Sequence, residues 1–391
     1  MKLRKVRMGG INEVGCLVVD DNGVPIDRIC RYTLIDLSGQ ADTTQANITR
    51  HVIHIERWAQ KHGVDLEDEV VLGGLSKGEL FTSFVRHLER FSDQSSVVSI
   101  GTVEPEYFNQ RIDASIAYFD YLVSRANARR HTGDPMIIQI IKLAEKLKER
   151  LQKRRRHVAK NSQVYGLSLL LQASLYQGLS DPKYFGWNRN TALRNKLICR
   201  ICYETGVRRG ELLSLTIENC RTSKLGPGER PYIETMENVK YDDPRTSVPH
   251  NKTRARIIPI SNSLANLIEE YKKIRNQSDA ARKQPPFLIL SGQLPYQPLS
   301  LSALSSVFDT IKAKLPGVGR FGPHRLRHTF FENLDRMMKD KGYSDDQKKK
   351  IKNSIGGWSP KSRQSENYEK LATLEQTVEA LSQFHSELEG C

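Results

Sequence analysis

The sequence predicts a mainly α-helical protein with a small antiparallel β-sheet, divided into a helical N-terminal domain and an α+β C-terminal domain. Three observations predict this class. Apolar residues recur at helical spacing over most of the 391 residues. Short strand-like runs gather in two places, before residue 40 and between residues 231 and 290. A dense basic run near residue 155 lies between the two parts, close to a predicted linker.

The first forty residues predict a small β element. Val14–Val19 and Ile29–Leu37 are strand-like runs on either side of Asn22-Gly23, and Asn-Gly is a strong turn signal. From about Thr44 the pattern becomes helical, and further helices are expected at 77–91, 104–127 and 135–157. We therefore predict a β extension over 1–41 and a compact helical domain over 42–160.

The C-terminal part follows a predicted linker over 161–184. Arg189–Thr205 is expected to form a helix that ends at Gly206, because glycine suits a left-handed cap, and a second helix opens near Arg209. We expect the second domain, which closes with a C-terminal helix, to extend over 185–391. Strands are expected at 231–235, 255–260 and 287–290, and helices at 262–275, 300–314, 324–339, 345–354 and 362–388.

Charge is the main compositional signal. The chain has 60 Lys and Arg against 45 Asp and Glu, a net charge of +15. Such a surplus favours a polyanionic partner, and a solvated basic surface is an equally good interpretation of charge alone. A hydrophobic content of 38% excludes a largely disordered chain. No signal peptide and no apolar run of membrane-spanning length is recognised, so we expect a soluble, cytoplasmic, nucleoid-associated protein.

Two local patterns refine this expectation. Cys199 and Cys202 form a C-x-x-C inside an apolar helical pattern without a second pair nearby, which predicts core thiols rather than a metal site. The end of the 135–157 helix is rich in cations, more than a helix dipole requires. We expect phosphate-backbone contacts from this run, namely Lys153, Arg154, Arg155, Arg156 and Lys160.

Phosphate chemistry is also indicated further along the chain. His324 and Arg327, at i and i+3 after Pro323, are neighbours at a helix start, where a phosphate is readily bound. Arg208 lies in the turn after Gly206, with Arg209 as the alternative. Glu211 could orient an arginine through a charge-assisted hydrogen bond.

Attack on a phosphodiester needs a nucleophile, a proton donor for the leaving oxygen and cations on the non-bridging oxygens. Tyr368 could supply the nucleophile, because a phosphate between two arginines favours its phenolate. Trp358 can donate one hydrogen bond through its indole N–H, or serve as a buried anchor. Lys252, at a hairpin tip, and Lys240, which closes the preceding strand, are the candidate acids.

These motifs together resemble the tyrosine recombinases, the phage-integrase type of site-specific recombinase. The resemblance rests on Thr205–Leu212, on Pro323–Phe330 with its His-x-x-Arg, and on Gly356–Pro360 followed by Tyr368. Their order and spacing agree over about residues 185–370. The helical region before residue 158 resembles the family's core-binding domain at the level of pattern.

The resemblance implies roles for six residues. Arg208 and Arg327 would clamp the scissile phosphate, His324 would assist proton transfer, and Trp358 would contact a phosphate oxygen. Tyr368 would form a 3′-phosphotyrosine, and Lys252 would match the family's β-hairpin lysine. The resemblance implies no metal or other cofactor.

The expected function is site-specific cutting and rejoining of double-stranded DNA. The alternatives are a type IB topoisomerase, which uses the same groups, and a non-catalytic DNA-binding protein with this fold. An amphipathic tail follows Tyr368, with Leu371, Leu374, Val378, Leu381 and Leu388 at heptad-like spacing. It is equally suited to packing on its own domain and to docking on a neighbouring protomer, which would form a tetramer on DNA.

Overall fold

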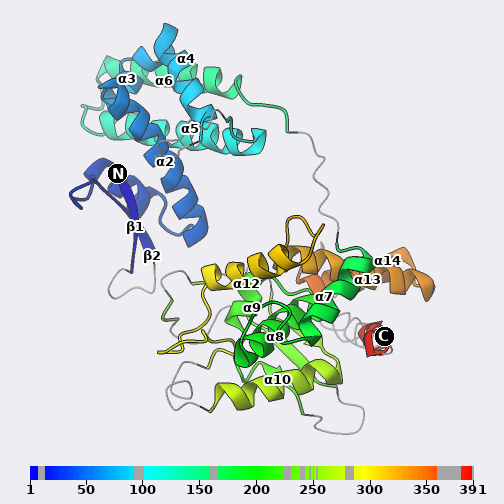
Figure 1. The fold of residues 1–391 in the computed structure, drawn as a ribbon. Helices are drawn as coiled ribbons and strands as arrows, with labels where there is room; N and C mark the ends of the chain where they lie inside the picture. Colours follow the sequence, from blue (N-terminus) through cyan, green and yellow to red (C-terminus); the bar gives the residue numbers. More distant parts are fainter. Residues whose placement is uncertain are drawn as a thin grey trace. The chain divides into compact units, whose positions relative to one another are not determined.

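The structure is a computed structural model, and it describes residues 1–7, 14–91, 101–158, 166–223, 230–237, 243–245, 248–249, 251, 254–277, 286–358 and 380–389. The chain forms two units, Met1–Ser162 and Gln163–Cys391 (Figure 1). Each has its own hydrophobic core and one small antiparallel sheet. The predicted fold class, mainly α with small antiparallel β structure, is confirmed.

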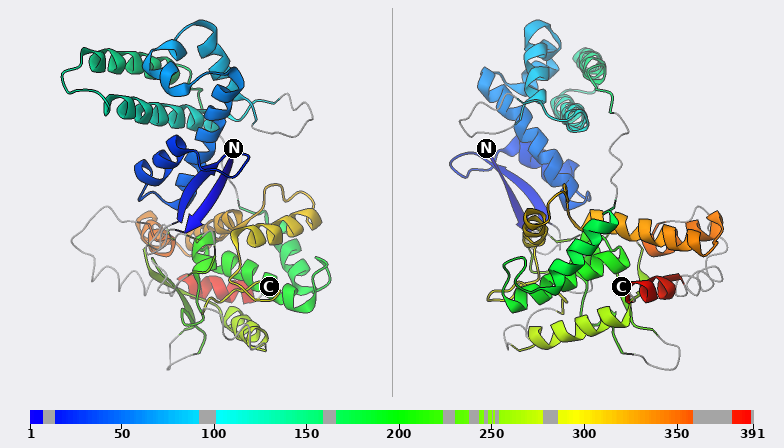
Figure 2. Two further views of the ribbon diagram at one scale, coloured as in Figure 1. Left: turned by 90° about the vertical axis from the view of Figure 1, so that its left-hand side faces the viewer. Right: turned by 45° about the vertical axis from the view of Figure 1, so that its right-hand side comes forward.

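The first unit opens with a two-stranded hairpin of β1 (Lys2–Arg7) and β2 (Val14–Val19). The strands are antiparallel, with Lys2 opposite Val19. The predicted turn after β2 forms, because the Asp20 carboxylate accepts hydrogen bonds from the backbone N–H groups of Asn22 and Val24, both within 2.9 Å. Both views of Figure 2 show this hairpin beside helix α2, which contacts it.

The strand predicted at Ile29–Leu37 is wrong. The segment forms helix α1 (Asp27–Arg31) and a π-helical turn, η1 (Tyr32–Asp36). Its buried positions are Ile29, Cys30, Tyr32, Thr33 and Leu37, a helical rather than an alternating pattern. The true partner of β2 is the strand before it.

Helices build the rest of the first unit, and the predicted helices there are present. They are α2 (Asp42–His62), α3 (Leu66–Val71), the 3-10 turn η2 (Gly74–Ser76), α4 (Gly78–Glu89), α5 (Pro105–Asn127) and α6 (Pro135–Gln152). Trp58 on α2 is fully buried and meets Phe84 of α4 edge to face, 4.9 Å between ring centroids. Prolines at the starts of α5 and α6 suit the first helical turn, where no N–H partner is needed.

The second unit contains both helices and short strands. They are α7 (Leu169–Ser180), α8 (Arg189–Thr205), α9 (Arg209–Ser214), β3 (Cys220–Arg221), β4 (Tyr232–Thr235), β5 (Arg256–Pro259), α10 (Asn262–Arg275), α12 (Leu301–Lys314), α13 (Pro323–Asp340), α14 (Asp345–Gly356) and a helical segment at 380–389. Short polar side chains cap the starts of five of these helices: Ser168, Asn188, Ser261, Ser300 and Ser344. Each accepts a backbone N–H that would otherwise lack a partner in the helix.

Helix α8 is the centre of this unit and packs against α13 and α10. Cys199 and Cys202 on α8 are buried in the core, which confirms the prediction of core thiols. Helix α7, which lies in the segment predicted as linker, contacts α8 and buries Leu175 and Leu179 in the same core. The core thus begins earlier in the sequence than residue 185.

The three strands form an antiparallel sheet in the order β3-β4-β5, with Ile233 opposite Ile258. The strand predicted at 287–290 is wrong, because Phe287 and Leu290 make only isolated bridges. This apolar run is fully buried, and its backbone groups bond to several elements instead of one strand. Leu288 N–H, for example, donates to the carbonyl of Leu215 at 2.7 Å.

The helical segment at 380–389 packs on the second unit itself. Ala380, Leu381 and Phe384 are buried in its core, and the Phe384 ring lies 5.9 Å from that of Phe330 on α13. The earlier tail positions Leu371, Leu374 and Val378 lie outside the described residues. Among the described helices, none has both the length and the apolar character to cross a membrane.

Candidate active site

The first arginine of the candidate site is placed by the turn between α8 and α9. Gly206 ends α8 with φ of 60°, and a side chain there would also collide with the ring of Phe330. The chain then extends so that Arg208 immediately precedes α9. The Glu211 carboxylate accepts the backbone N–H of Arg208 at 2.7 Å, which fixes the start of that helix.

The second arginine comes from the second turn of α13. Arg327 is 95% buried, and its guanidinium donates to the carbonyl oxygens of Gly206 and Gly356, the latter at 3.2 Å. Arg208 donates to the same Gly356 oxygen at 3.0 Å. The structure therefore brings together two arginines that lie 119 positions apart in the sequence, the difference between 327 and 208.

The C-terminus of α14 organises these contacts. The last carbonyls of a helix have no partner within it and carry the negative end of its dipole. Here the Gly356 carbonyl accepts from Arg208 and Arg327, and the Ile355 carbonyl accepts from Arg256 on β5. Gly357, with φ of 64°, ends the helix.

Arg256 is a site residue that the sequence alone did not indicate. Its guanidinium binds both carboxylate oxygens of Glu211, at 2.8 and 3.0 Å, and both side chains are almost fully buried. Glu211 thus does orient an arginine, and that arginine comes from a strand 45 residues away. No local signal could find this pair, since only the fold brings it together.

The cluster has an excess of positive charge. Among the described residues, the guanidinium groups of Arg208 and Arg256 lie 3.8 and 2.8 Å from the Glu211 carboxylate. Arg327 shares the Gly356 carbonyl with Arg208 and adds a third guanidinium group. Burial, followed by repulsion from Arg208, lowers the pKa of Arg327 to about 9. The guanidinium remains protonated at neutral pH, and an anion between the arginines would relieve this repulsion.

A cavity of about 550 Å³ lies beside the arginines. Arg208, His324, Arg327 and Trp358 all line it, so the four described members of the predicted set meet in one place. Three lysines of α14 also line it, Lys348, Lys349 and Lys352. Two of them are paired with acids of the same lining, Lys348 with Asp345 at 3.2 Å and Lys352 with Asp335 at 2.6 Å. The two arginines are the groups that suit a phosphate here.

Trp358 closes one side of this cavity without being buried. It is 41% exposed, and its ring stacks on Phe331 at 5.2 Å between centroids. The guanidinium carbon of Arg327 lies 5.3 Å from the Trp358 ring centroid, which is cation–π distance. Trp358 therefore both supports Arg327 and leaves part of its indole accessible from the cavity.

His324 faces the same cavity. Its Nε2 lies 3.1 Å from Nε2 of His328, one turn later on α13. Desolvation, then the nearby charges of His328, Arg327 and Arg208, lower the pKa of His324. A lowered pKa keeps the imidazole neutral near pH 7, the form that can accept a proton.

Three members of the predicted site lie outside the described residues: Lys252, Tyr368 and Lys160, as does the alternative Lys240. Trp358 is the last described residue before Tyr368. In the part of the chain that the structure describes, no three His, Cys, Asp or Glu side chains gather as metal ligands. The described donors, mainly guanidinium and ammonium groups, suit an anion.

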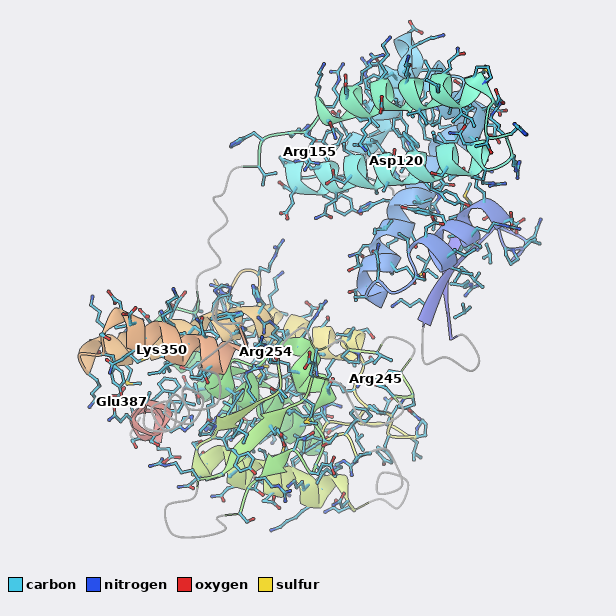
Figure 3. The ribbon with its side chains drawn as sticks, turned by 180° about the vertical axis from the view of Figure 1, so that it is seen from behind. Asp120, Arg155, Arg245, Arg254, Lys350 and Glu387 are labelled. Atoms are coloured by element: carbon cyan, nitrogen blue, oxygen red, sulfur yellow. The ribbon has the colours of Figure 1, made fainter. Side chains whose placement is uncertain are left out.

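The basic run of the first unit lies just after α6, where Arg155 is seen in Figure 3. Lys153 and Arg154 are exposed. Arg156 is held by Glu89 at 2.6 Å and lies 4.8 Å over the Phe108 ring, and Arg155 pairs with Asp113. Arg156 therefore also has a structural task, and the guanidinium of Arg154, although exposed, lies 5.8 Å from the Phe81 ring centroid.

Part of the second unit is similar to a known protein family. Residues 179–341 match the model of the phage integrase family. The second unit therefore contains a domain of the phage integrase family. The matched segment includes Arg208, His324 and Arg327 and ends before Trp358. The matches do not favour the topoisomerase alternative.

Individual relatives are distant. The tyrosine recombinase XerC of Staphylococcus carnosus (strain TM300) is 22% identical over 142 residues, which span 36% of this chain and 40% of the relative. Among solved structures, an integrase of transposon Tn1549 in complex with transposon right-end DNA is 14% identical with a TM-score of 0.48, covering 93% of this chain and 98% of that one. The XerA recombinase is 16% identical with a TM-score of 0.35, covering 85% and 97%.

Proposed function

We propose that this protein, which contains a phage integrase family domain, is a site-specific DNA recombinase or integrase that cuts and rejoins DNA strands through a 3′-phosphotyrosine intermediate. The observation that carries the proposal is the shared acceptor of its two arginines. Arg208 and Arg327 both donate to the Gly356 carbonyl and both line a cavity with His324 and Trp358. Pairs of arginines in one cavity suit the non-bridging oxygens of a phosphodiester.

The described residues take distinct roles. Arg208 and Arg327 bind the non-bridging oxygens and stabilise the charge that accumulates in the transition state. His324, neutral at pH 7, takes or orients a proton on the attacking side. Trp358 donates its indole N–H to a phosphate oxygen. Glu211 and Arg256 position Arg208 and do not contact the phosphate.

The covalent step assigns roles to two residues outside the described part. The Tyr368 oxygen attacks phosphorus, a phosphotyrosine bond forms, and the bond to the 5′-oxygen breaks. That oxygen leaves as a hydroxyl with a proton from Lys252, or from Lys240 as the alternative. Attack by the 5′-hydroxyl of a partner strand reverses the step. The bond energy is conserved in the covalent intermediate, so the reaction requires no nucleotide and no metal.

Double-stranded DNA is the proposed partner. The net charge of +15 supports it, as do the exposed Lys153 and Arg154 and the lysines of α14. Recombination of two duplexes needs more than one protomer, and a homotetramer is proposed. The segment at 380–389 packs on its own unit, so exchange between protomers would rest on the tail before it or on its release.

Covalent trapping tests the proposal without knowledge of the target site. The protein is incubated with sheared, lightly nicked DNA from its source, denatured in detergent, and analysed for protein–DNA adducts. We expect an adduct whose phosphotyrosine maps to Tyr368 by mass spectrometry, and its loss in Tyr368→Phe. Tyr184→Phe, a half-exposed tyrosine of the same unit, is the matched control and should retain the adduct. An adduct that persists in Tyr368→Phe would refute the assignment.

A paired comparison separates the candidate acids. Lys252→Ala and Lys240→Ala are assayed with a substrate whose leaving 5′-oxygen is replaced by sulfur, which needs no proton to depart. The variant that loses cleavage of ordinary DNA but recovers it with the sulfur substrate identifies the acid. If both variants cleave ordinary DNA normally, neither lysine is the acid.

A further inference from the structure

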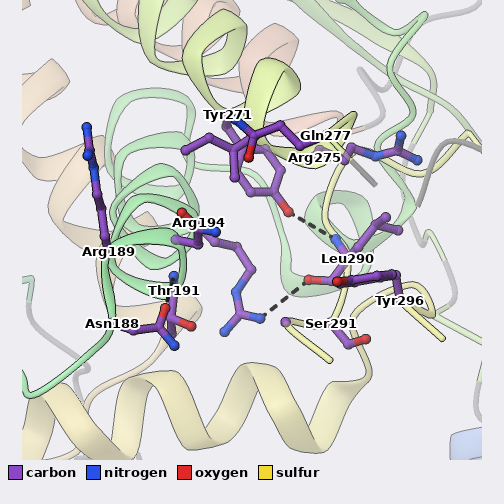
Figure 4. A pocket seen from close by; sticks show the side chains of 13 residues that line it. Asn188, Arg189, Thr191, Arg194, Tyr271, Arg275, Gln277, Leu290, Ser291 and Tyr296 are labelled. Atoms are coloured by element: carbon purple, nitrogen blue, oxygen red, sulfur yellow. Dashed lines mark hydrogen bonds between the residues drawn. The ribbon is translucent and has the colours of Figure 1, made fainter. Parts of the chain in front are cut away.

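A second cavity of the C-terminal unit has no part in the chemistry proposed above. It has a volume of about 480 Å³ and lies at the N-terminus of α8, between that helix, the end of α10 and the loop after Leu290 (Figure 4). α8 has 17 residues, so a rise of about 1.5 Å per residue places its two ends about 25 Å apart. Arg208 follows the far end, and this cavity is therefore separate from the candidate active site.

Arg194 is the central side chain of this second cavity. In Figure 4 its guanidinium lies between Thr191 of α8 and the segment Leu290–Ser291. It is bound only to neutral groups that the structure describes: the side-chain oxygen of Asn195 at 3.0 and 3.1 Å, and the Leu290 carbonyl at 3.4 Å. Burial lowers the pKa of Arg194, the effect of desolvating a cation without a carboxylate beside it.

Arg194 supplies the positive charge of the cavity, whose described lining has neither an aspartate nor a glutamate. Two other arginines belong to the lining but are directed elsewhere. Arg189 extends away from Arg194 in Figure 4, and buried Arg275 donates to the Phe287 carbonyl at 3.2 Å and to the Asn276 side chain at 3.0 Å.

The positive end of the α8 dipole adds to the field of Arg194. The Thr191 hydroxyl supplies a further donor, whereas the Ser291 hydroxyl already donates to the Gln293 carbonyl at 3.0 Å. A site with this composition attracts an anion and offers it several hydrogen bonds.

Two further features shape the cavity. Tyr296 lines it and has φ of 56°, a left-handed conformation that an aromatic residue rarely adopts. Gly292 is also part of the lining, and a Cβ there would lie 3.4 Å from a terminal nitrogen of Arg194. The glycine thus leaves the guanidinium accessible, and the aromatic ring offers a flat surface beside it.

We propose that this cavity binds a phosphate ester of nucleotide size, with the phosphate on Arg194 and the base against Tyr296. Arginine binds two phosphate oxygens through its planar fork, and aromatic rings stack on any base. The volume falls in the range of small-ligand sites, about 300–1,000 Å³, larger than a bare phosphate needs. The nucleotide comes from one of two sources, a free mononucleotide or a nucleotide unit of bound DNA.

Direct binding tests the site in the full-length protein. Adenosine and thymidine 5′-monophosphates and inorganic pyrophosphate are titrated by calorimetry at low salt. We expect binding that weakens at least tenfold in Arg194→Gln and remains unchanged in Arg320→Gln, an exposed arginine of the same unit. Gly292→Ala, which narrows access to Arg194 without removing charge, should also weaken binding. Urea unfolding of each variant shows whether the fold is intact.

The DNA source is tested by the salt dependence of binding to a nonspecific duplex, an arm that rests on the proposed function. If DNA supplies the nucleotide, Arg194→Gln lowers the slope of log affinity against log salt by about one. If a free nucleotide is bound, mononucleotide binding is lost in Arg194→Gln and that slope is unchanged. If Arg194→Gln alters neither measurement, the proposal is overturned, whatever the Tyr368 adduct experiment shows. Loss of that adduct alone would not affect the mononucleotide result.

Discussion

Acidification to pH 5.5 should destabilise the N-terminal unit through histidines that are buried in neutral form. His54 and His87 stack at 4.0 Å between ring centroids, and each ring donates from Nε2 to the other's backbone carbonyl at 2.9 Å. His51 lies one turn before His54 and packs against Tyr107. This cluster holds α2 against α4 and α5.

The pKa values give the sign and the size of the effect. Desolvation, and then the Arg111 cation, lower the pKa of His51 to about 4 and that of His54 to about 3, and desolvation also lowers the pKa of His87. The unfolded chain, with histidine pKa values near 6.5, binds more protons than the folded chain below that pH. The stability that these neutral histidines contribute is therefore fully present above pH 6.5. It is lost as the pH falls towards their pKa values in the folded state.

At pH 5.5 the protonated form of a histidine in the unfolded chain outnumbers the neutral form about tenfold. This protonation lowers the free energy of unfolding by about 1.4 kcal/mol for each histidine that stays neutral in the fold. His51 and His54 together then lower the free energy of unfolding by about 3 kcal/mol, and His87 lowers it further. Most carboxylates are still ionised at this pH. The loss is large against a typical domain stability of about 5–15 kcal/mol.

Urea unfolding between pH 7.5 and 5.5 measures this loss. Fluorescence of a variant with only Trp58, made by Trp187→Phe and Trp358→Phe, reports the N-terminal unit, because Trp58 is fully buried there. His157→Asn, an exposed histidine, is the matched control and should leave the pH dependence unchanged. His54→Gln should reduce it by about 1.4 kcal/mol. A free energy of unfolding that is equal at the two pH values would refute the reasoning.

Three predictions concern the candidate active site. Arg327→Lys removes the planar fork and should lower adduct formation about 10²–10³-fold with little change in DNA affinity; equal activity would show that only the charge matters. Glu211→Gln leaves Arg256 buried without its counter-charge and should cost about 3–5 kcal/mol in urea unfolding, so a loss below 1 kcal/mol would contradict the tight pairing. Gly206→Ala should lower the melting temperature because a methyl group collides with Phe330; an unchanged melting temperature argues against the close contact.

Local sequence signals predicted much of the second unit. The helix at Arg189–Thr205, the left-handed cap at Gly206 and the position of Arg208 depend on residues within one turn of each other, and the structure has all three. The strand predicted at Ile29–Leu37 is wrong because it also rested on local signals alone. The apolar residues of this run suggested a strand there, but their burial follows a helical period, which is decided by packing on β2 and α5.

Long-range contacts could not be predicted in this way. The pair of Glu211 and Arg256 joins α9 to β5. Neither residue type is unusual in its own segment, since an acid in a first helical turn and an arginine in a strand next to a turn are both ordinary. Their partnership is visible only once the sheet and the helices are packed.

The C-terminus of α14 explains why the motifs occur in one order. Two arginines close enough to share a phosphate repel each other, and in the free protein some acceptor must hold them in place. Carbonyl oxygens at a helix end fulfil this task with partial charge, so they do not neutralise the arginines as a carboxylate would. α14 lies beyond the segment that matches the family, which ends at residue 341, and it ends one residue before Gly357-Trp358. The helix that aligns the arginines therefore also delivers Trp358 to the cavity, and Tyr368 follows ten residues later in the sequence.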